Sequence, residues 1–596
     1  MVAIRTLCDI LEKLEREHRK PALLRYKSGG KWNDISTEEF VSTVRGLAMG
    51  LLGLGIRKGD RVAILAENRP EWNTFDHAIL AIGGVVVPIY SPLPANQVRF
   101  ILDNSQSRLL ILSTPEQLEK VTPILPSLPD IKRLVMMDRP EAMPANALLW
   151  SDLLQQGEAA LAENPGRLAD ETAQVGKDDL ATIVYTSGTT GEPKGVMLTH
   201  GNLVSNIIAT GSIVPFSHAD EALSFLPLTH VFERMLEFLY LDAGVTIAHA
   251  ESINAVPANI AEIRPTVMAS VPRLLEKVQA RAMDAVYASS APRRWIFALG
   301  LWAGRQCSLA KLNGRPEPFV ARLLRPITDK LVFAKLRQRM GGRLRFVISG
   351  SAPLACEIAE FFHAARIPVL EGYGLTETSP VVSVNTPQRT RLDTVGPVLP
   401  GVEVRIADDG EILVRGPNVM QGYFRNEKET QEVMRDGWFL TGDIGHMDAD
   451  GFLVITDRKK EILKTSGGKM IAPQPIENLL KCDPFISQVV LIGDRRKFVS
   501  ALIAPDPQRL AAYAKEHGIA YTDVFELRDD PRIVELYRQR VASRMEGLSN
   551  FEKVKKFRLL PRELSIEEGE LTPKLTTKRR VVNEKFAELI ESMYGD

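Results

Sequence analysis

The spacing of apolar side chains predicts alternating helices and strands over the first part of the chain. Apolar residues recur at helical spacing from Phe40 to Leu52, directly behind Ser36 and Glu39, which have the spacing of a capping box. Gly55 then stands where a glycine commonly follows the end of a helix. Runs of Val, Ile and Leu predict strands at residues 61–65, 85–90 and 108–113. This alternation favours an α/β fold.

The pattern changes in the later part of the chain. Short strand-like runs separated by turn residues predict a small β subdomain; they lie at residues 402–406, 410–415 and 451–456. The charged cluster Asp457–Glu461 follows, and mixed helix and strand patterns continue from there to residue 596. We therefore expect a domain boundary at this cluster.

Composition narrows the function classes. At 596 residues the chain is long enough for two to four folding units. Its composition, 45% hydrophobic and 25% charged, is that of a soluble globular protein. Its formal net charge is zero, which gives no overall attraction to nucleic acid. The four cysteines are far apart and match no zinc-site spacing, which favours a reducing compartment. Asp9 and Glu12 interrupt the apolar core that a signal peptide would need. The sequence has no run of eighteen apolar residues, the length that a membrane-spanning helix requires. We expect a cytoplasmic protein.

Residues 185–200 carry the most informative chemistry in the chain. They hold three glycines, one lysine, and four Ser or Thr hydroxyls before Glu192, and they follow a strand-like run at 181–185. A strand that feeds a glycine- and hydroxyl-rich loop presents N–H and O–H donors to phosphate. The loop lacks the Gly-Lys-Ser/Thr ending of a Walker motif, and an ordinary surface loop is the alternative. The candidate phosphate ligands are Thr186, Ser187, Gly188, Thr189, Thr190 and Lys194.

A second motif, Glu371–Thr378, follows the apolar run at 367–370. Tyr373 stands between two glycines and can lay its ring on a purine, while Glu377 offers a carboxylate. A carboxylate beside ATP phosphates is best explained by Mg²⁺, which prefers oxygen ligands. A surface turn with a capping glutamate is the alternative. Asp443, which we expect in a turn, suits hydrogen bonding to two ribose hydroxyls.

Together these strings resemble the signatures of the AMP-forming adenylating enzymes, a superfamily that includes acyl-CoA synthetases, firefly luciferase and the adenylation domains of peptide synthetases. The resemblance runs from about residue 20 to the end of the chain. It implies a large N-terminal domain of α/β subdomains plus a small β subdomain (1–457), a hinge (458–460), and a smaller mobile α+β C-terminal domain (461–596). It also implies that Glu377 and Thr190 hold Mg²⁺. The adenine site would be formed by Gly350, Ser351, Ala352, Gly372, Tyr373, Gly374 and Thr376.

The resemblance also implies roles for residues near the hinge. Arg458 would contact the ribose or a phosphate, and the C-terminal domain would rotate about Lys460. Gly467, Gly468 and Lys469 would then approach the channel for the pantetheine arm of coenzyme A. The alternative for 457–461 is a solvated run of charges.

Two further residues are candidates for the chemistry itself. Gly569–Lys578 resembles the segment that carries the adenylation lysine, which places that lysine at Lys578. The sequence departs from the commonest family form, because Thr576-Thr577 stands where Ser-Gly is usual. Lys574 is therefore the alternative. His230 lies in a segment whose family counterpart sits between the acyl and CoA sites, and a purely structural histidine is the alternative.

These features predict ATP-dependent ligation of a fatty acid to coenzyme A through an acyl-AMP intermediate, with release of AMP and pyrophosphate. The Leu-Thr-Pro start of the Lys578 segment and its Lys-Arg-Arg-Val-Val finish resemble the long-chain branch, so a long-chain acid is expected. One alternative is a fatty acyl-AMP ligase that passes the acyl group to a carrier protein. Another is a catalytically silent nucleotide- or lipid-binding protein.

One segment is not explained by these motifs. Residues 281–345 contain fourteen Lys or Arg against three acids, interleaved with aromatic and aliphatic residues such as Trp295 and Trp302. Such a segment can lie on the anionic inner face of a membrane or attract the phosphates of coenzyme A. Ordinary surface helices are the alternative.

Overall fold

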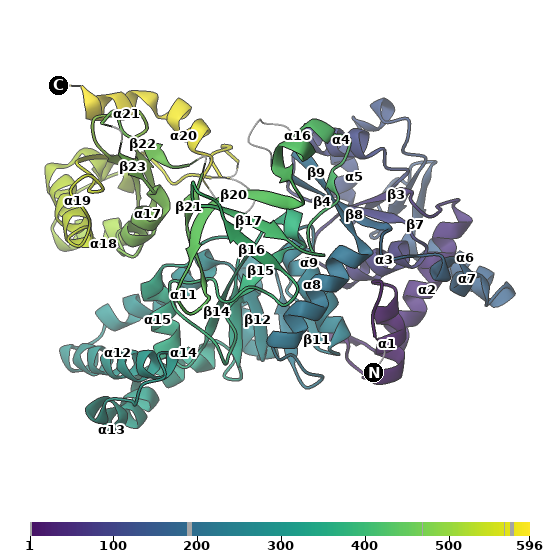
Figure 1. The fold of residues 1–596 in the computed structure, drawn as a ribbon, viewed down its shortest axis with the longest axis horizontal. Coiled ribbons are helices and arrows are strands. Elements are labelled where there is room, and N and C mark those ends of the chain that lie inside the picture. The colour runs from purple at the N-terminus through teal and green to yellow at the C-terminus, as the bar shows by residue number, and fades with distance from the viewer. Residues whose placement is uncertain are drawn as a thin grey trace.

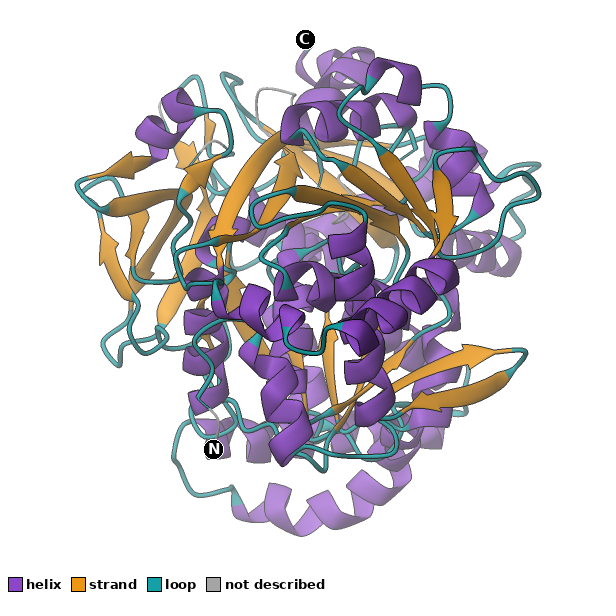
Figure 2. Ribbon diagram, turned by 90° about the vertical axis from the view of Figure 1, so that its right-hand side faces the viewer, coloured by secondary structure: helices purple, strands orange, loops and turns teal. Residues whose placement is uncertain are grey.

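The computed structural model describes residues 3–187, 193–459, 461–467, 469–565, 567–571 and 577–595. It shows an α/β protein with a large N-terminal part and a smaller C-terminal part, the latter at the upper left of Figure 1. In Figure 2 helices lie in front of and behind the strands of the large part. This is the fold class that the sequence predicted.

The first large sheet carries the two strands that flank the predicted phosphate loop. Its central strands are parallel, and on one side it continues from β8 (Leu180–Ser187) into the antiparallel strands β9 (Pro193–Thr199) and β18 (Gly422–Tyr423). The predicted strands at 61–65, 85–90 and 108–113 all lie in it. In spatial order its strands are β18 (Gly422–Tyr423), β9 (Pro193–Thr199), β8 (Leu180–Ser187), β4 (Val85–Tyr90), β3 (Arg61–Ala66), β5 (Leu109–Leu112), β6 (Arg133–Met136) and β7 (Ala147–Leu149).

The second large sheet carries the Tyr373 motif near one edge. Its middle strands are also parallel, while its two outermost pairs are antiparallel. In spatial order the strands are β15 (Val381–Val384), β14 (Val369–Gly374), β13 (Phe346–Ser349), β12 (Val267–Ser270), β10 (Glu221–Ser224), β11 (Thr246–His249), β1 (Leu24–Ser28) and β2 (Lys31–Ile35). Strands β10 to β13 in the middle are almost wholly buried, as expected for a sheet covered on both faces, whereas β1 and β2 at one edge are largely polar and partly exposed.

Helices connect these strands and pack on the sheets. The predicted capping position is confirmed in part, since the Ser36 side chain accepts a hydrogen bond from the Glu39 backbone N–H at the start of α2. The helices that precede the small β subdomain are α1 (Asp9–Glu17), α2 (Thr37–Gly53), α3 (Pro70–Ala81), α4 (Ala95–Ser105), α5 (Pro115–Val121), α6 (Trp150–Glu163), α7 (Arg167–Ala173), α8 (His200–Ile213), α9 (Val231–Asp242), α10 (Val256–Ile263), α11 (Pro272–Tyr287), α12 (Ala291–Leu312), α13 (Phe319–Thr328), α14 (Ala334–Arg339) and α15 (Cys356–Ala364).

A small antiparallel β subdomain follows, as predicted. Buried Ile412, Val414 and Leu453 form its centre together with Val382 of the second large sheet. Its strands are β16 (Glu403–Ile406), β17 (Glu411–Arg415), β19 (Met434–Arg435), β20 (Trp438–Met447) and β21 (Leu453–Arg458), and α16 (Glu427–Val433) lies before β19.

The C-terminal part has a hydrophobic core of its own. Apolar side chains cover both faces of a sheet formed by β24, β25 and β26, in two clusters that contain no residue before Leu463. Its elements are β22 (Leu463–Lys464), β23 (Met470–Ile471), α17 (Pro473–Lys481), β24 (Ile486–Ile492), β25 (Ser500–Pro505), α18 (Pro507–Glu516), α19 (Pro531–Arg544), β26 (Lys556–Leu559), α20 (Arg579–Lys585) and α21 (Ala587–Tyr594).

Polar contacts join the two parts near α11 and α15. The Arg273 guanidinium donates to the Ser487 carbonyl at 3.1 Å, and Arg544 pairs with Glu357 at 3.1 Å. Both contacts lie at partly exposed positions, where ion pairs contribute little to stability.

Two local predictions about site residues were wrong. Asp443 lies inside strand β20 and not in a turn, and Gly372 to Gly374 continue strand β14 and do not follow it. Gly442 has a φ of +70°, and the pairing of β20 shifts register between Ile444 and Gly445. The strand is therefore locally irregular at this point. The sequence there has the composition of a turn, although the strand pairing continues through it.

Candidate active site

The described phosphate-loop candidates lie where β8 ends and β9 begins. Thr186 stands opposite Lys194 in the antiparallel ladder, and Ser187 stands opposite Pro193. The pairing of the two strands thus brings one hydroxyl residue and the lysine to the same level of the hairpin. Gly188, Thr189 and Thr190 lie outside the described residues, as does the rest of 188–192.

Lys194 is joined to Glu377 by a short chain of side chains. Its ammonium lies 2.5 Å from a carboxylate oxygen of Glu429 on α16, and 5.3 Å from the centre of the Tyr423 ring. Tyr423, on β18, donates its hydroxyl hydrogen bond to Oε1 of Glu377 at 2.9 Å. Burial raises the pKa of Tyr423 above its usual range, so the phenol keeps its proton and remains a donor. The phosphate-loop lysine and the candidate magnesium ligand therefore belong to one cluster.

Tyr373, Asp443 and Arg458 form a second cluster. The Tyr373 hydroxyl donates to Oδ2 of Asp443 at 2.7 Å, and Nε of Arg458 lies 3.2 Å from Oδ1. Asp443 and Arg458 also face each other in the β20–β21 ladder. Burial raises the pKa of Asp443, while the Arg458 charge and the Tyr373 hydrogen bond oppose that rise. The structure thus brings together the three residues predicted to contact adenine and ribose.

The backbone around Glu377 is held tightly. Thr376 and Thr378 are buried in a short helical turn, and the carbonyl of Glu377 accepts a hydrogen bond from the Met420 N–H at 2.8 Å. At Gly374 a Cβ atom would lie 1.8 Å from the carbonyl oxygen of Pro380, so no other residue fits. Such packing fixes the backbone position from which the Glu377 side chain extends.

The predicted adenine loop follows β13 and lies against α9. A Cβ on Gly350 would come within 3.2 Å of the Phe232 ring, and Ser351 has a φ of +69°. Ala352 follows in the same loop. His230 precedes α9, and its Nδ1 accepts a hydrogen bond from the Phe232 N–H at 3.2 Å. His230 thus has the structural role of capping α9 and lies beside the adenine loop, while its gating role stays a prediction.

Lys578 lies at the start of α20 in the C-terminal part. It is half-buried, and its backbone N–H donates to the Glu570 carbonyl at 2.7 Å. The next residue, Arg579, is firmly anchored: its guanidinium lies 2.8 Å from Glu477 and 3.4 Å from Glu461. Glu461 follows the expected hinge directly. The base of the candidate adenylation lysine is therefore tied to the hinge end of the C-terminal part.

Two further candidates, Gly467 and Lys469, lie between β22 and β23. Gly467 and Lys469 are exposed, and the Lys469 ammonium lies 5.5 Å from the centre of the Phe551 ring. Lys460, Gly468 and Lys574 lie outside the described residues.

A magnesium ion would find one protein carboxylate at the expected place. Among the described residues no group of three or more His, Cys, Asp or Glu side chains could hold a metal by itself. Glu377 is half-buried and offers the acceptor-only oxygens that Mg²⁺ prefers. A site completed by phosphate oxygens and water fits this arrangement, since Mg²⁺ commonly binds through one or two carboxylates plus substrate phosphates.

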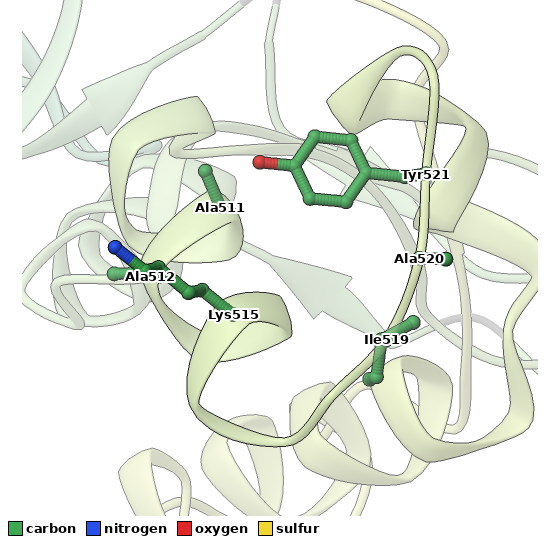
Figure 3. A pocket seen from close by; sticks show the side chains of 6 residues that line it. All are labelled: Ala511, Ala512, Lys515, Ile519, Ala520 and Tyr521. Carbon is green, nitrogen blue, oxygen red and sulfur yellow. The ribbon is translucent and has the colours of Figure 1, made fainter.

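Two surface depressions of the described residues lie away from these clusters. One of about 480 Å³ lies on α18 and the segment after it, lined by Lys515, Ile519 and Tyr521 (Figure 3). Another of about 510 Å³ lies beside the end of α8 and includes Arg389. Neither contains a predicted site residue.

Sequence reasoning missed Tyr423, Glu429 and Arg579. Tyr423 lies in a two-residue strand and Glu429 in a short helix, and both lie more than forty residues from the Glu371–Thr378 motif. No motif or periodicity in the surrounding sequence identifies Tyr423 or Glu429 as a site residue. Their contacts arise only because β18 adds to the edge of the first large sheet.

Comparison with known proteins defines the class. The family model "AMP-binding enzyme" matches residues 11–424, and "AMP-binding enzyme C-terminal domain" matches residues 460–596. The chain belongs to the AMP-binding enzyme family.

Relatives cover nearly the whole chain. It is 39% identical over 586 residues to the long-chain-fatty-acid–CoA ligase FadD15 of Mycobacterium bovis, covering 98% of this chain and 96% of that protein. It is 36% identical over 578 residues to the peroxisomal long chain acyl-CoA synthetase 6 of Arabidopsis thaliana, covering 92% and 80%. The structure of the anthranilate CoA ligase AuaEII with anthranoyl-AMP shares the fold, with a TM-score of 0.74 at 20% identity and 99% coverage of both chains.

Proposed function

We propose that this chain is an ATP-dependent, AMP-forming ligase that joins a long-chain fatty acid to coenzyme A. The observation that carries the proposal is the joining of the nucleotide motifs into two side-chain clusters, Tyr373–Asp443–Arg458 and Lys194–Glu429–Tyr423–Glu377. The similarity to long-chain ligases over nearly the full chain supports the choice of acid and acceptor.

In the first half-reaction a fatty acid carboxylate attacks the α-phosphorus of ATP. An oxygen–phosphorus bond to the acid forms, the bond to the bridging oxygen breaks, and pyrophosphate leaves with the electron pair. Because both reactants are anions, catalysis depends on alignment and on neutralising charge. Tyr373 would lie on the adenine, Asp443 would accept from the ribose hydroxyls, and the hydroxyls and amides of 186–190 would contact the phosphates.

Positive charge would come from several sources. Mg²⁺ held by Glu377, with Thr190, would neutralise phosphate charge when bound. Lys194 already lies within this cluster, and Arg458 lies beside Asp443. Lys578 would add its ammonium to the same phosphates, with Lys574 as the alternative.

In the second half-reaction the sulfur of coenzyme A attacks the carbonyl carbon of acyl-AMP. A carbon–sulfur bond forms, the carbon–oxygen bond to AMP breaks, and the thiol proton passes to solvent. Lys578 and the 467–469 turn lie on the same C-terminal part. Rotation of that part about Lys460 would withdraw Lys578 and bring Gly467, Gly468 and Lys469 towards the thiol, a gating motion common among enzymes.

ATP–pyrophosphate exchange that depends on a fatty acid, followed by mass spectrometry of the products, tests the proposal. Exchange and acyl-CoA are expected, and a series of acids from acetate to stearate should give its highest kcat/KM near the long end. Exchange with acyl-AMP accumulating and coenzyme A unused would instead indicate transfer to a carrier protein. Absence of exchange with every acid would indicate a silent binding protein.

Cellular location is part of the same proposal. Within the described part of the chain, no helix combines the length and the apolar character needed to cross a bilayer. We place the enzyme in the cytoplasm, with contact at the inner face of a membrane through residues 281–345.

A further inference from the structure

Helix α13 presents an exposed apolar face. The hairpin that it forms with α12 projects at the lower left of Figure 1. Of the fourteen large hydrophobic side chains that are exposed in the described residues, eight lie between Tyr287 and Leu331. Five of these form what we name the α13 face: Phe319 (70% exposed), Val320 (56%), Leu323 (66%), Ile327 (63%) and Leu331 (59%).

The α13 face arises because the large apolar side chains recur at helical spacing on the side of the helix that faces away from the protein core. Phe319, Leu323 and Ile327 recur every four residues and share one side of the helix. The opposite side carries the small residues Ala321 and Thr328, which are buried. Ala321 packs with Ala303 and Cys307 of α12. The helix therefore buries its small residues and exposes its large apolar ones, whereas a surface helix normally does the reverse.

The hairpin surrounds this face with positive charge. Its two acids are neutralised within the hairpin and the following helix, since Glu317 pairs with Arg325 at 2.8 Å and Asp329 with Arg337 at 2.7 Å. Six basic side chains of α12, α13 and their flanks are exposed and form no ion pair with any described residue: Arg293, Arg294, Lys311, Arg315, Arg322 and Lys330.

We propose that the α13 face binds the surface of a bilayer that contains anionic lipid, with Phe319, Leu323 and Ile327 inserted among the acyl chains. An apolar helix face flanked by Lys and Arg is the arrangement of interfacial helices, and each cation near an anionic surface strengthens binding. A second copy of the chain is disfavoured as the occupant, because it would bring Arg322 and Lys330 against the same cations.

Binding depends on this surface alone, while its purpose rests on the proposed function. A long-chain acid partitions into the bilayer, so an enzyme held there meets its substrate at a high local concentration. Rather than consuming dissolved acid, the enzyme would then take it from the membrane that it rests on.

Cosedimentation of the full chain with vesicles tests the binding. The protein is expected to bind vesicles of phosphatidylcholine and phosphatidylglycerol, and to bind pure phosphatidylcholine vesicles more weakly. Leu323→Glu/Ile327→Glu should lower the partition coefficient at least about tenfold, because it charges the inserted face. Arg322→Ala/Lys330→Ala should lower it by roughly fivefold or more on anionic vesicles only.

Matched controls exclude general effects of the substitutions. Ile253, which is 67% exposed on a separate turn, takes the same change as Ile253→Glu. Arg139→Ala/Arg495→Ala removes two exposed cations elsewhere and keeps the same net charge as the Arg322/Lys330 variant. Both controls should bind vesicles like the wild-type chain, and thermal melts should show that all variants are folded.

Three results would overturn the inference. The first is that the wild-type chain does not bind anionic vesicles, and the second is that Leu323→Glu/Ile327→Glu binds them as well as the wild-type chain does. The third is that light scattering shows a wild-type dimer, which Leu323→Glu/Ile327→Glu converts to monomer without any change in vesicle binding. Activity is scored separately in the absence of vesicles, with the same series of acids from acetate to stearate. If acyl-CoA never forms, the proposed function fails while the vesicle result still decides the surface.

Discussion

The two halves of the candidate site are built differently. In the N-terminal half the predicted residues contact one another or a shared partner, as Tyr373 contacts Asp443 and Glu377 contacts Tyr423. In the C-terminal half Lys578 is held through its backbone, and Lys469 lies over a ring of its own domain. One half is organised before ligands arrive, while the other presents charges at the surface of a separate unit.

This difference separates two tasks. Preorganised groups stabilise charge without reorientation, which suits the residues that hold the nucleotide in both half-reactions. Residues on a separately folded unit can serve one half-reaction and then leave. Polar contacts that join the two units, such as Arg273 with Ser487 and Arg544 with Glu357, are partly exposed and individually weak. Rotation of the C-terminal part stays a prediction, and the variants below test the comparison.

Lys578→Ala should give the largest effect. Loss of a cation at the developing phosphate charge should slow acyl-AMP formation by roughly 10²–10³. Thioester formation from supplied acyl-AMP should stay near the wild-type rate, as measured by quenched-flow analysis of each half-reaction. Lys574→Ala is the matched control. If the control loses adenylation and Lys578→Ala does not, the lysine has been assigned to the wrong position.

Glu377→Gln should come next. The substitution keeps the size of the side chain and the hydrogen bond from Tyr423 but removes the charge, which should slow adenylation by about 10². The concentration of Mg²⁺ that gives half-maximal rate should rise at the same time. A slower reaction with unchanged magnesium dependence would contradict the ligand role and leave only a structural one.

Asp443→Asn should act mainly on nucleotide binding. A charge-assisted hydrogen bond to ribose contributes about 1.5–3 kcal/mol, so KM for ATP should rise roughly 10- to 100-fold. The maximal adenylation rate should change less, because the ribose hydroxyls take no part in the bonds that form and break at the α-phosphorus. An unchanged affinity for ATP, measured by calorimetry, would remove Asp443 from the ribose site.

Tyr423→Phe should give the smallest effect. It removes one hydrogen bond to Glu377 and preserves the ring beside Lys194, which corresponds to about 0.5–1.5 kcal/mol, or roughly 2- to 10-fold in adenylation rate. Tyr521→Phe, in the depression of Figure 3, is the matched control and should have no effect. Equal rates in the two variants would show that Glu377 is held without Tyr423.

Local sequence patterns predicted much of this structure. The run at 85–90 predicted a strand with its final bounds, because a buried parallel strand is a continuous apolar run. Asp443 was placed wrongly because Thr441-Gly442-Asp443 has the composition of a turn, although the ladder continues through it. Tyr423 and Glu429 could not be found, since their contacts with Glu377 and Lys194 depend on strand order and not on spacing along the chain.

The chain alone thus determined the kinds of groups that the site would hold and the fold class, because both depend on short motifs and on the periods of helix and strand. Only the tertiary structure decided which groups meet. Lys194 and Glu377 are 183 positions apart in the sequence, and the pairing of β18 with β9 brings both to Tyr423. The same holds for α13, whose spacing marks an amphipathic helix but does not say which side is buried. Packing of Ala321 on α12 decided that its apolar side faces outward.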